Sequence, residues 1–494
     1  MPKREAAVAP LVLSLDAGAA TPLHQQLCSE LRRAITGGRL LPGSRLPPTR
    51  TLAQMLHLGR STVLSAFEQL CAEGYLEARV GDGTYVADPL PEDVLLSQAL
   101  PAVPPATRPP HASRRGLRTA AALAGGAPDN GRPRAFRPCL PDVQHFPSDV
   151  WARISARVAR HASAALLHYG EPAGYAPLRA QIATYLASAR AVACHPDQII
   201  VVAGTQQAIA LAAHVLLDEG DTVWVEDPGY PAGRGALLSA GAQLCPVPVD
   251  RAGLVVSAGR ALAPGARMAM VTPSYQFPLG ATMSLTRRRE LLAWVEAADA
   301  WVFEDDYDSE YRYTERPLPA LHGMSAGGRV IYCGTFSKVL FPALRLGYLV
   351  VPPGLVDLFA AARALADRHA PTLEQATLAE FMAEGHFFQH LRRMRTRYAL
   401  RQAALVEAVR AELGGLLAVE PAEGGMHLVG WLPPGTDDRR AAQQALLAGV
   451  EAPALSAYTG APPDRPGVLL GYTAVDEAAI RRGVHVLATV WQAG

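Results

Sequence analysis

A segment rich in proline and alanine divides this chain into two unlike halves, and this division decides how the chain can fold. Residues 89–134 contain nine Pro and nine Ala, almost no aromatic or β-branched residues, and no sustained hydrophobic period. Such a composition predicts an extended, poorly packed linker. Because 494 residues exceed one ordinary core, we expect a multidomain protein with domains at residues 12–88 and 135–494.

The composition indicates a globular protein of the cytoplasm. Hydrophobic residues make up 49% of the chain and charged residues 18%, and the formal net charge is +1, so any nucleic-acid surface must be local. The first residues imitate a secretory signal, but Glu5 and Pro10 interrupt that pattern. Polar residues also break the apolar stretch Ile199–Leu217, so we expect no membrane span.

The cysteines give no sign of a metal site. They lie far apart, without the paired spacing that binds zinc or forms a redox couple. The six positions are Cys28, Cys71, Cys139, Cys194, Cys245 and Cys333. We interpret them as reduced thiols and expect no bound metal.

The N-terminal half has the pattern of a helix-turn-helix. Residues 22–35 form an amphipathic helical pattern that stops at two glycines. A second short helix is expected from Thr49, and after a break at Gly59 a third begins near Ser61. Residues 75–86 then suggest a hairpin with a glycine-rich tip, which would form a wing. In such a motif the second helix of the pair offers its N-terminal residues to the major groove.

A local excess of arginine points to DNA. Between Leu31 and Phe67 there are six arginines and no acidic residue. Arg60 at the start of the third helix can reach guanine edges or phosphate, and the hydroxyls of Ser61 and Thr62 can cap the helix or bind phosphate. The alternative is a three-helix packing module whose arginines are merely solvated.

The N-terminal half resembles a known family of DNA-binding domains. The runs at residues 22–27, 46–50, 60–63 and 67–70 are similar to the winged helix-turn-helix of the GntR type. In that family the arginines that match Arg50 and Arg60 contact DNA. The predicted DNA-binding residues are therefore Arg50, Arg60, Ser61, Thr62 and Gly83.

In the C-terminal half, strand-like runs alternate with helical patterns. The strand-like runs are Ile199–Val202, Thr222–Val225, Met268–Thr272 and Trp301–Glu304. This alternation predicts a mainly parallel, doubly wound α/β sheet.

One lysine in this half follows a run of small hydroxyl residues. Lys338 comes after Thr335 and Ser337, and Arg345 lies seven positions further on. This arrangement suits a Schiff base to pyridoxal phosphate whose phosphate is bound by the two hydroxyls and the arginine. Taken alone, a lysine in such a loop is more often an ordinary solvated residue.

Upstream residues agree with a cofactor site. Asp305 ends a strand, where a buried carboxylate would keep the pyridine nitrogen protonated, and Tyr307 would contact the ring hydroxyl. Thr205 and Gln206 open a helix, where a phosphate binds well. Tyr230 follows another strand and could stack on the cofactor ring. Each feature has an alternative interpretation: Thr205 could cap a helix, the residues before Tyr230 could form a turn, and the acidic residues around Asp305 could be a solvated patch. Because all these features occur together in this order, coincidence is a poor explanation.

The C-terminal half resembles the aminotransferases of fold type I, with a smaller α+β subdomain. The runs at residues 168–179, 304–311 and 334–338 are typical of that family. Together with the winged helix, they resemble the MocR family of regulators. The resemblance implies pyridoxal 5′-phosphate as cofactor and a homodimer with head-to-tail domain exchange. It also implies cofactor sites near the subunit boundary.

Two departures from the aminotransferase pattern concern the substrate. Phe277 stands where many aminotransferases have an asparagine that binds the ring oxygen. The expected strand at residues 467–472 lacks the arginine that often pairs with a substrate carboxylate, and residues 441–464 contain no arginine. These departures disfavour productive transamination of an α-amino acid. The effector would then lack a carboxylate or use another partner such as Arg234.

Three functions remain open from the sequence. The first is a regulator in which an amine or amino acid reacts with the aldimine at Lys338 and shifts the dimer between two conformations that bind operator DNA differently. The second is an active aminotransferase with an accessory DNA-binding domain. The third is a regulator that responds to pyridoxal phosphate itself.

Overall fold

The computed structural model describes residues 13–16, 18–91, 111–123, 134–313, 319–325, 327–460 and 463–492. The chain forms two compact units, Met1–His111 and Ala112–Gly494. The boundary between the units therefore falls within the predicted linker.

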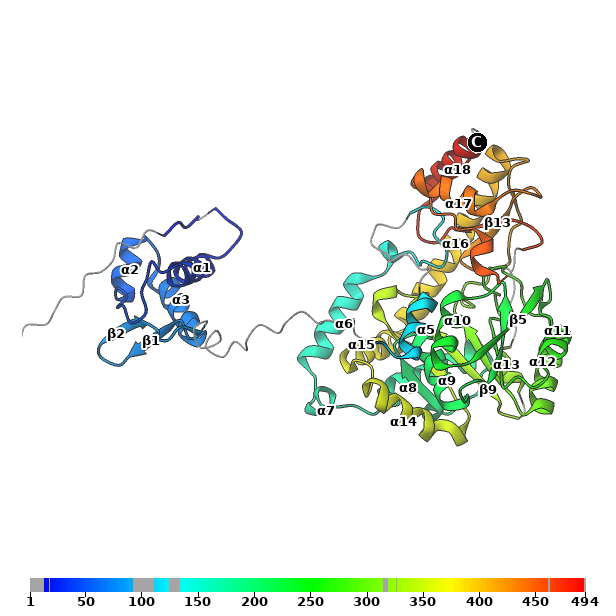
Figure 1. Cartoon of the computed structure of the whole chain (residues 1–494), viewed down its shortest axis with the longest axis horizontal. Coiled ribbons are helices and arrows are strands. Elements are labelled where there is room, and N and C mark those ends of the chain that lie inside the picture. The colour runs from blue at the N-terminus through cyan, green and yellow to red at the C-terminus, as the bar shows by residue number, and fades with distance from the viewer. Residues whose placement is uncertain are drawn as a thin grey trace, which may run out of the picture. The chain divides into compact units, whose positions relative to one another are not determined.

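The first unit is a three-helix domain with a hairpin (Figure 1). Its elements are α1 (Leu23–Thr36), α2 (Thr49–Met55), α3 (Arg60–Ala72), β1 (Leu76–Arg79) and β2 (Gly83–Val86). The helices bury Leu31, Leu52 and Phe67 in a common core, and the two strands pair antiparallel. The predicted mainly α winged helix-turn-helix is confirmed. Leu90, which we had placed in the linker, is buried in this core, so the packing continues past residue 88.

The predicted linker is not extended throughout. Residues Arg114–Leu123 form helix α5, which packs against α10 (Pro231–Ala240). The hydroxyls of Thr119 and Ser239 lie 2.8 Å apart, and Arg118 pairs with Glu219 at 2.9 Å. The alanines of this segment favour a helix, and its polar side chains find partners on the second unit. Our prediction of an extended chain is therefore wrong here, and residues 92–110 and 124–133 lie outside the described residues.

The second unit contains an eight-stranded sheet. Its order is β3-β10-β9-β8-β7-β4-β5-β6. The strands are β3 (Ile199–Val202), β4 (Thr222–Asp227), β5 (Gln243–Asp250), β6 (Gly253–Leu254), β7 (Met268–Val271), β8 (Trp301–Asp306), β9 (Val330–Thr335) and β10 (Gly347–Val350). Only β10 and β6 run opposite to the other six strands, so the predicted mainly parallel sheet is confirmed.

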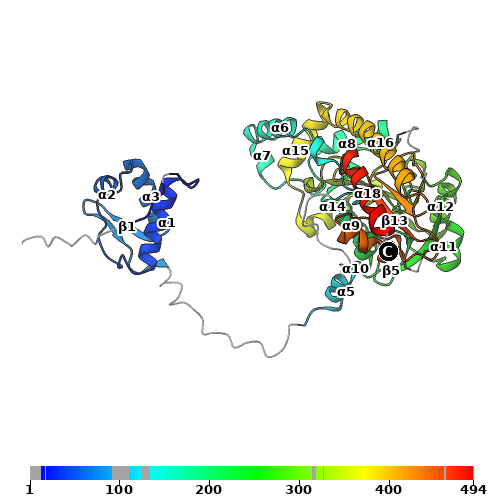
Figure 2. The same cartoon turned by 90° about the horizontal axis from the view of Figure 1, so that it is seen from above.

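Helices cover both faces of this sheet (Figure 2). Consecutive residues of β4 show why: Val223 and Val225 pack in one core cluster, and Trp224 stacks on Trp294 in another, with ring centroids 3.7 Å apart. Besides α5 and α10, the helices of this unit before the smaller sheet are α6 (Ser148–Arg160), α7 (Ala164–Leu167), α8 (Ala176–Ala189), α9 (Thr205–Leu216), α11 (Val256–Leu262), α12 (Leu285–Ala298), α13 (Leu321–Met324), α14 (Val356–Asp367) and α15 (Thr372–Ala383). Strands buried on both faces carry near-continuous apolar runs, as these do.

A smaller antiparallel sheet with its own helices follows in the chain. Its elements are α16 (His386–Glu412), β11 (Ala418–Val419), β12 (His427–Trp431), α17 (Asp438–Leu447), β13 (Gly467–Gly471) and α18 (Glu477–Gln492). The sheet order is β11-β12-β13. This part confirms the predicted α+β subdomain. Within the described ranges, no helix has both the length and the apolarity needed to cross a bilayer.

Candidate functional site

The predicted cofactor residues gather at one edge of the large sheet. Strands β3, β4, β8 and β9 all end at this edge, and α/β sheets bind their ligands at the carboxyl ends of strands. These ends carry Thr205, Tyr230, Asp305 and Lys338, which are far apart in the sequence. Because β10 is antiparallel, it begins at the same edge, two residues after Arg345. The topology thus brings the predicted residues together, while their roles toward a bound cofactor stay predictions.

The start of α9 and Arg345 form a cradle for an anion. Gly204 precedes the helix with φ +117°, and a Cβ atom there would lie 3.3 Å from Arg345 Nη2. The guanidinium therefore lies close to the free backbone N–H groups of the helix start, where the dipole also favours negative charge. The hydroxyl of Ser337 is buried and has no hydrogen-bond partner among the described residues. These groups fit a phosphate.

Three of the predicted phosphate ligands have other partners in the structure. The Gln206 amide donates to the hydroxyl of Tyr230 at 3.0 Å. The Thr205 hydroxyl is hydrogen-bonded to the carboxyl of Asp305. Thr335 Oγ1 accepts a hydrogen bond from the Ser337 backbone N–H at 3.2 Å. The side chains of Thr205, Gln206 and Thr335 thus shape neighbouring site residues.

Asp305 and Tyr307 fit the two polar ends of a pyridine ring. Asp305 is 6% exposed, and its Oδ1 has no partner among the described residues. Burial, with the nearby carboxylates of Asp306 and Glu226, raises the pKa of Asp305 to about 7. A protonated ring nitrogen would supply the missing cation. Burial also raises the pKa of Tyr307 well above its ordinary value, so its hydroxyl, which has no partner in the described part of the chain, stays a neutral donor.

The lysine itself is held by a segment that the sequence analysis did not single out. Lys338 Nζ donates to the backbone carbonyl of Cys139 at 3.0 Å. Cys139 has φ +59°, which is uncommon for a residue with a side chain and often marks a functional site. Phe136 in the same segment is fully buried and bridges to Gly471 of β13. The positive φ and these long-range contacts have no local sequence signal.

A buried ion pair supports the strand end that carries Asp305. Arg190 Nε donates to Asp306 Oδ2 at 2.7 Å, and both side chains are almost fully buried. Tyr332 and Ser309 donate to the same oxygen at 2.5 and 2.9 Å. A buried pair persists only with such added hydrogen bonds. It fixes the backbone on which Asp305 and Tyr307 stand.

The structure shows what surrounds Phe277, which departs from the aminotransferase pattern, and Arg234, the suggested alternative partner for a carboxylate. Phe277 forms edge contacts with Tyr230 and Tyr307, with ring centroids 6.1 and 6.2 Å apart, so an aromatic wall replaces an amide. Arg234 pairs with Asp227 at 3.0 Å, and Asp227 also accepts from the Gly460 N–H. Arg234 therefore holds the loop after β4, which argues against its use as a carboxylate partner.

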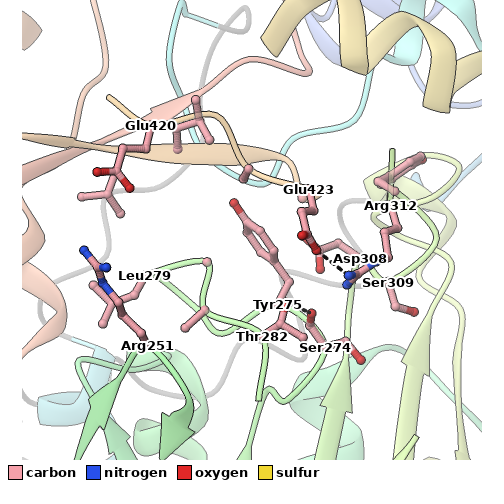
Figure 3. A pocket seen from close by; sticks show the side chains of 18 of the residues that line it. Arg251, Ser274, Tyr275, Leu279, Thr282, Asp308, Ser309, Arg312, Glu420 and Glu423 are labelled. Atoms are coloured by element: carbon pink, nitrogen blue, oxygen red, sulfur yellow. Dashed lines mark hydrogen bonds and ion pairs between the residues drawn. The ribbon is translucent and has the colours of Figure 1, made fainter. Parts of the chain in front are cut away.

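A cavity of about 650 Å³ lies between the loops of the large sheet and the smaller subdomain. Its lining comes from residues 274–282, 308–312 and 420–431, with Arg251 and Arg465 at other points of the wall. Figure 3 shows Arg312 paired with Glu423 on one side and Arg251 on the other. Asp308 lines the cavity and also interacts electrostatically with Lys338.

The first unit presents a basic surface at the start of α3 and on the hairpin. Arg50, Arg60 and Ser61 are exposed, as is Gly83 on β2, while Thr62 is half-buried. Two of the six predicted arginines are engaged elsewhere, because Arg32 pairs with Glu73 and Arg33 with Glu30. The sequence analysis missed Arg79, which stacks over Tyr85 at 4.4 Å on the wing.

Comparison with known proteins assigns a family to each part of the chain. Residues 23–86 match bacterial regulatory proteins of the gntR family, and residues 139–457 match aminotransferase class I and II. The second unit is similar to LysN, an α-aminoadipate aminotransferase from Thermus thermophilus solved with N-(5′-phosphopyridoxyl)-L-leucine. That likeness has a TM-score of 0.69 and 29% identity over 77% of this chain and 97% of LysN.

Whole-length relatives combine both parts. The chain is 42% identical to the probable rhizopine catabolism regulatory protein MocR of Rhizobium meliloti, over 98% of this chain and 96% of that protein. It is 31% identical to the pyridoxine biosynthesis regulator PdxR of Corynebacterium glutamicum, over 96% and 97% of the two chains. The chain therefore belongs to the MocR family of transcriptional regulators, in which a gntR-type DNA-binding domain is joined to an aminotransferase-like domain.

Proposed function

We propose that this regulator binds pyridoxal 5′-phosphate at Lys338 and uses it to sense an amine, an amino acid or the cofactor itself. The observation that supports this most directly is the cluster of unsatisfied groups at one edge of the sheet. One oxygen of the buried Asp305 carboxylate (Oδ1), the Tyr307 hydroxyl and the Ser337 hydroxyl lack partners among the described residues, and Arg345 lies at a helix start on the same edge. Buried polar groups without partners are rare, and a bound cofactor would satisfy all of them.

Each residue has a task in this proposal. Arg345, Ser337 and the start of α9 hold the phosphate, Asp305 holds the proton of the ring nitrogen, and Tyr307 donates to the ring oxygen. When bound, the cofactor supplies an electrophilic carbon that lysine or a ligand amine can attack. Phe277 excludes water from the wall between Tyr230 and Tyr307.

The route from this site to DNA runs through the covalent chain. The segment with Cys139 follows the linker and accepts a hydrogen bond from Lys338 Nζ. When the cofactor binds to Lys338, the hydrogen bond from Lys338 Nζ to the Cys139 carbonyl is lost. This loss changes the conformational energy of the segment around Cys139, which directly follows the linker. A ligand alters operator affinity only if it binds two such conformations with different affinity. Arg50, Arg60, Ser61, Thr62 and Gly83 remain the proposed DNA-binding residues.

The test combines visible absorbance with DNA binding on purified full-length protein. Loading with pyridoxal phosphate should give an absorbance band of the lysine-bound cofactor. If an amine or amino acid is the effector, one member of a panel should then shift that band stably and change the affinity for the upstream DNA of its own gene. If the cofactor is the effector, loading alone should change that affinity. Absence of saturable, salt-sensitive binding to this DNA would refute the proposal.

The second candidate is an active aminotransferase, favoured by the complete group of Lys338, Asp305, Tyr307 and Arg345 at one sheet edge. Repeated turnovers with an amino donor and a keto acid would favour it. We propose the regulator as the primary function because Phe277 replaces an amide and Arg234 is paired with Asp227. We further propose that the protein acts in the cytoplasm as a homodimer with exchanged DNA-binding domains.

A further inference from the structure

Asp308 is a buried carboxylate without a use in the cofactor site described above. It is 2% exposed, and its Oδ2 has no hydrogen-bond partner among the described residues. It stands directly after Tyr307 and lines the cavity between the two subdomains. Figure 3 shows its side chain beside Tyr275 and the Arg312–Glu423 pair. An unpaired carboxylate in such a position is costly unless a cation joins it.

The charges around Asp308 do not balance. Burial and the carboxylates of Asp306, Glu310 and Asp305 raise the pKa of Asp308 well above its ordinary value. Asp306 has Arg190 as a partner, and Glu310 accepts from Tyr185 at 2.6 Å. The attraction of Lys338 only partly offsets the repulsion at Asp308. A positive ligand group would therefore gain energy at this carboxylate.

Four of the five arginines that line the cavity have partners other than Asp308, and the fifth, Arg251, lies on the opposite side of the cavity from Asp308 (Figure 3). Arg312 pairs with Glu423, and Arg190 pairs with Asp306. Arg288 donates to three backbone carbonyls, and Arg465 stacks over Trp431 at 5.0 Å. The cavity thus leaves its most buried carboxylate to a ligand.

The walls near Asp308 suit an organic cation. Tyr275 and Tyr311 line the cavity, and their hydroxyls already bond to the carbonyls of His427 and Val339 at 2.6 and 3.2 Å. Both phenols are buried, and burial raises their pKa well above the ordinary value, so they stay neutral. Neutral aromatic rings favour ammonium groups over anions.

We propose that Asp308 selects effectors with two amino groups, one directed as the free amine to the cofactor at Lys338 and the other bound, as an ammonium cation, by the Asp308 carboxylate. This inference rests on the proposed sensing function and names its ligand class: diamines or basic amino acids. The cavity of about 650 Å³ gives room for the second group.

The test uses cofactor-loaded full-length protein and matched pairs of probes. 1,4-Diaminobutane is compared with 1-aminobutane, and 1,5-diaminopentane with 1-aminopentane, by the concentration that half-shifts the visible band and by operator affinity. We expect at least one diamine to act at a concentration at least tenfold lower than its monoamine, as one charge-assisted hydrogen bond would give. Asp308→Asn should bring that ratio close to one, and Asp308→Glu should restore most of it.

Glu423→Gln is the matched control. It also removes one negative charge from the cavity lining, but Glu423 is exposed and already paired with Arg312, so the diamine preference should persist. Equal responses to diamines and monoamines in the wild type would overturn this inference while leaving amine sensing intact. This outcome does not depend on whether the variants fold. A preference that survives in Asp308→Asn would overturn it too. If no amine or amino acid shifts the band or the operator affinity, both this inference and amine sensing fail.

Discussion

Replacing Gly204 by alanine should damage cofactor binding in a way that the structure allows one to estimate. Gly204 has φ +117° and ψ −179°, a conformation that residues with a Cβ adopt at a cost of about 1–3 kcal/mol. The new Cβ would lie 3.3 and 3.5 Å from the two terminal nitrogens of Arg345, so the guanidinium would have to shift by a few tenths of an ångström, which would weaken its hydrogen bond to the phosphate. Losing one hydrogen bond to a charged group costs about 1.5–3 kcal/mol, or about 10- to 150-fold in affinity for pyridoxal phosphate.

The measurement is a titration of apo-protein with pyridoxal phosphate, followed by visible absorbance, together with urea unfolding. Gly220→Ala is the control, because Gly220 has φ +97° but a Cβ there would meet nothing within 4 Å. Both variants should lose stability, since each places alanine at positive φ. Only Gly204→Ala should lose cofactor affinity beyond that. Equal affinities in the two variants would refute the assignment of the cradle.

Three further predictions concern other parts of the chain. Lys338→Ala should abolish the visible band of the bound cofactor while leaving circular dichroism and non-specific DNA binding unchanged; a persistent band would contradict the lysine assignment. Arg60→Ala should cost about 1–3 kcal/mol of operator binding if Arg60 reads a base, and titrations with operator and random duplexes should then differ. Burial and the charge of Asp306 raise the pKa of Glu304 from 4.5 to about 7. Between pH 4.5 and about 7 the Glu304 carboxyl therefore keeps its proton in the folded protein but loses it in the unfolded chain. As the pH rises through this range, the free energy of unfolding falls by about 1.4 kcal/mol per pH unit. Glu304→Gln should remove that slope from urea midpoints, and parallel slopes in the two proteins would contradict it.

The architecture could be predicted because each half carries strong local signals. Strands buried on both faces read as apolar runs, and the polar residues that follow them, such as Thr205 and Asp305, mark the carboxyl edge of the sheet. Because each of these polar residues follows a strand of the same parallel sheet, the sequence was enough to predict that they lie close together. Register and direction were not predictable: β10 runs against its neighbours, and this reversal brings Arg345 back to the same edge.

The linker shows where composition misleads. Proline and alanine content predicted an extended chain for residues 89–134, yet Arg114–Leu123 is helical and packs on α10. A window average hides that the prolines lie outside this stretch while three of the alanines lie within it. The contacts of Thr119 with Ser239 and of Arg118 with Glu219 join residues about 100 positions apart, which no local pattern reports.

The residues missed at the site share one physical property: their importance comes from what surrounds them. Cys139 matters because its carbonyl meets Lys338 Nζ, which lies 199 positions away in the sequence. Asp308 was visible in the acidic run after β8, but the sequence could not distinguish it from Asp306. The structure can, because Asp306 Oδ2 accepts from the Arg190 guanidinium and from two hydroxyls, whereas Asp308 has no ion-pair partner among the described residues. Two aspartates of equal chemistry thus differ in surroundings, since Asp306 is paired with a cation of the protein and Asp308 is the one that we propose a ligand cation pairs with.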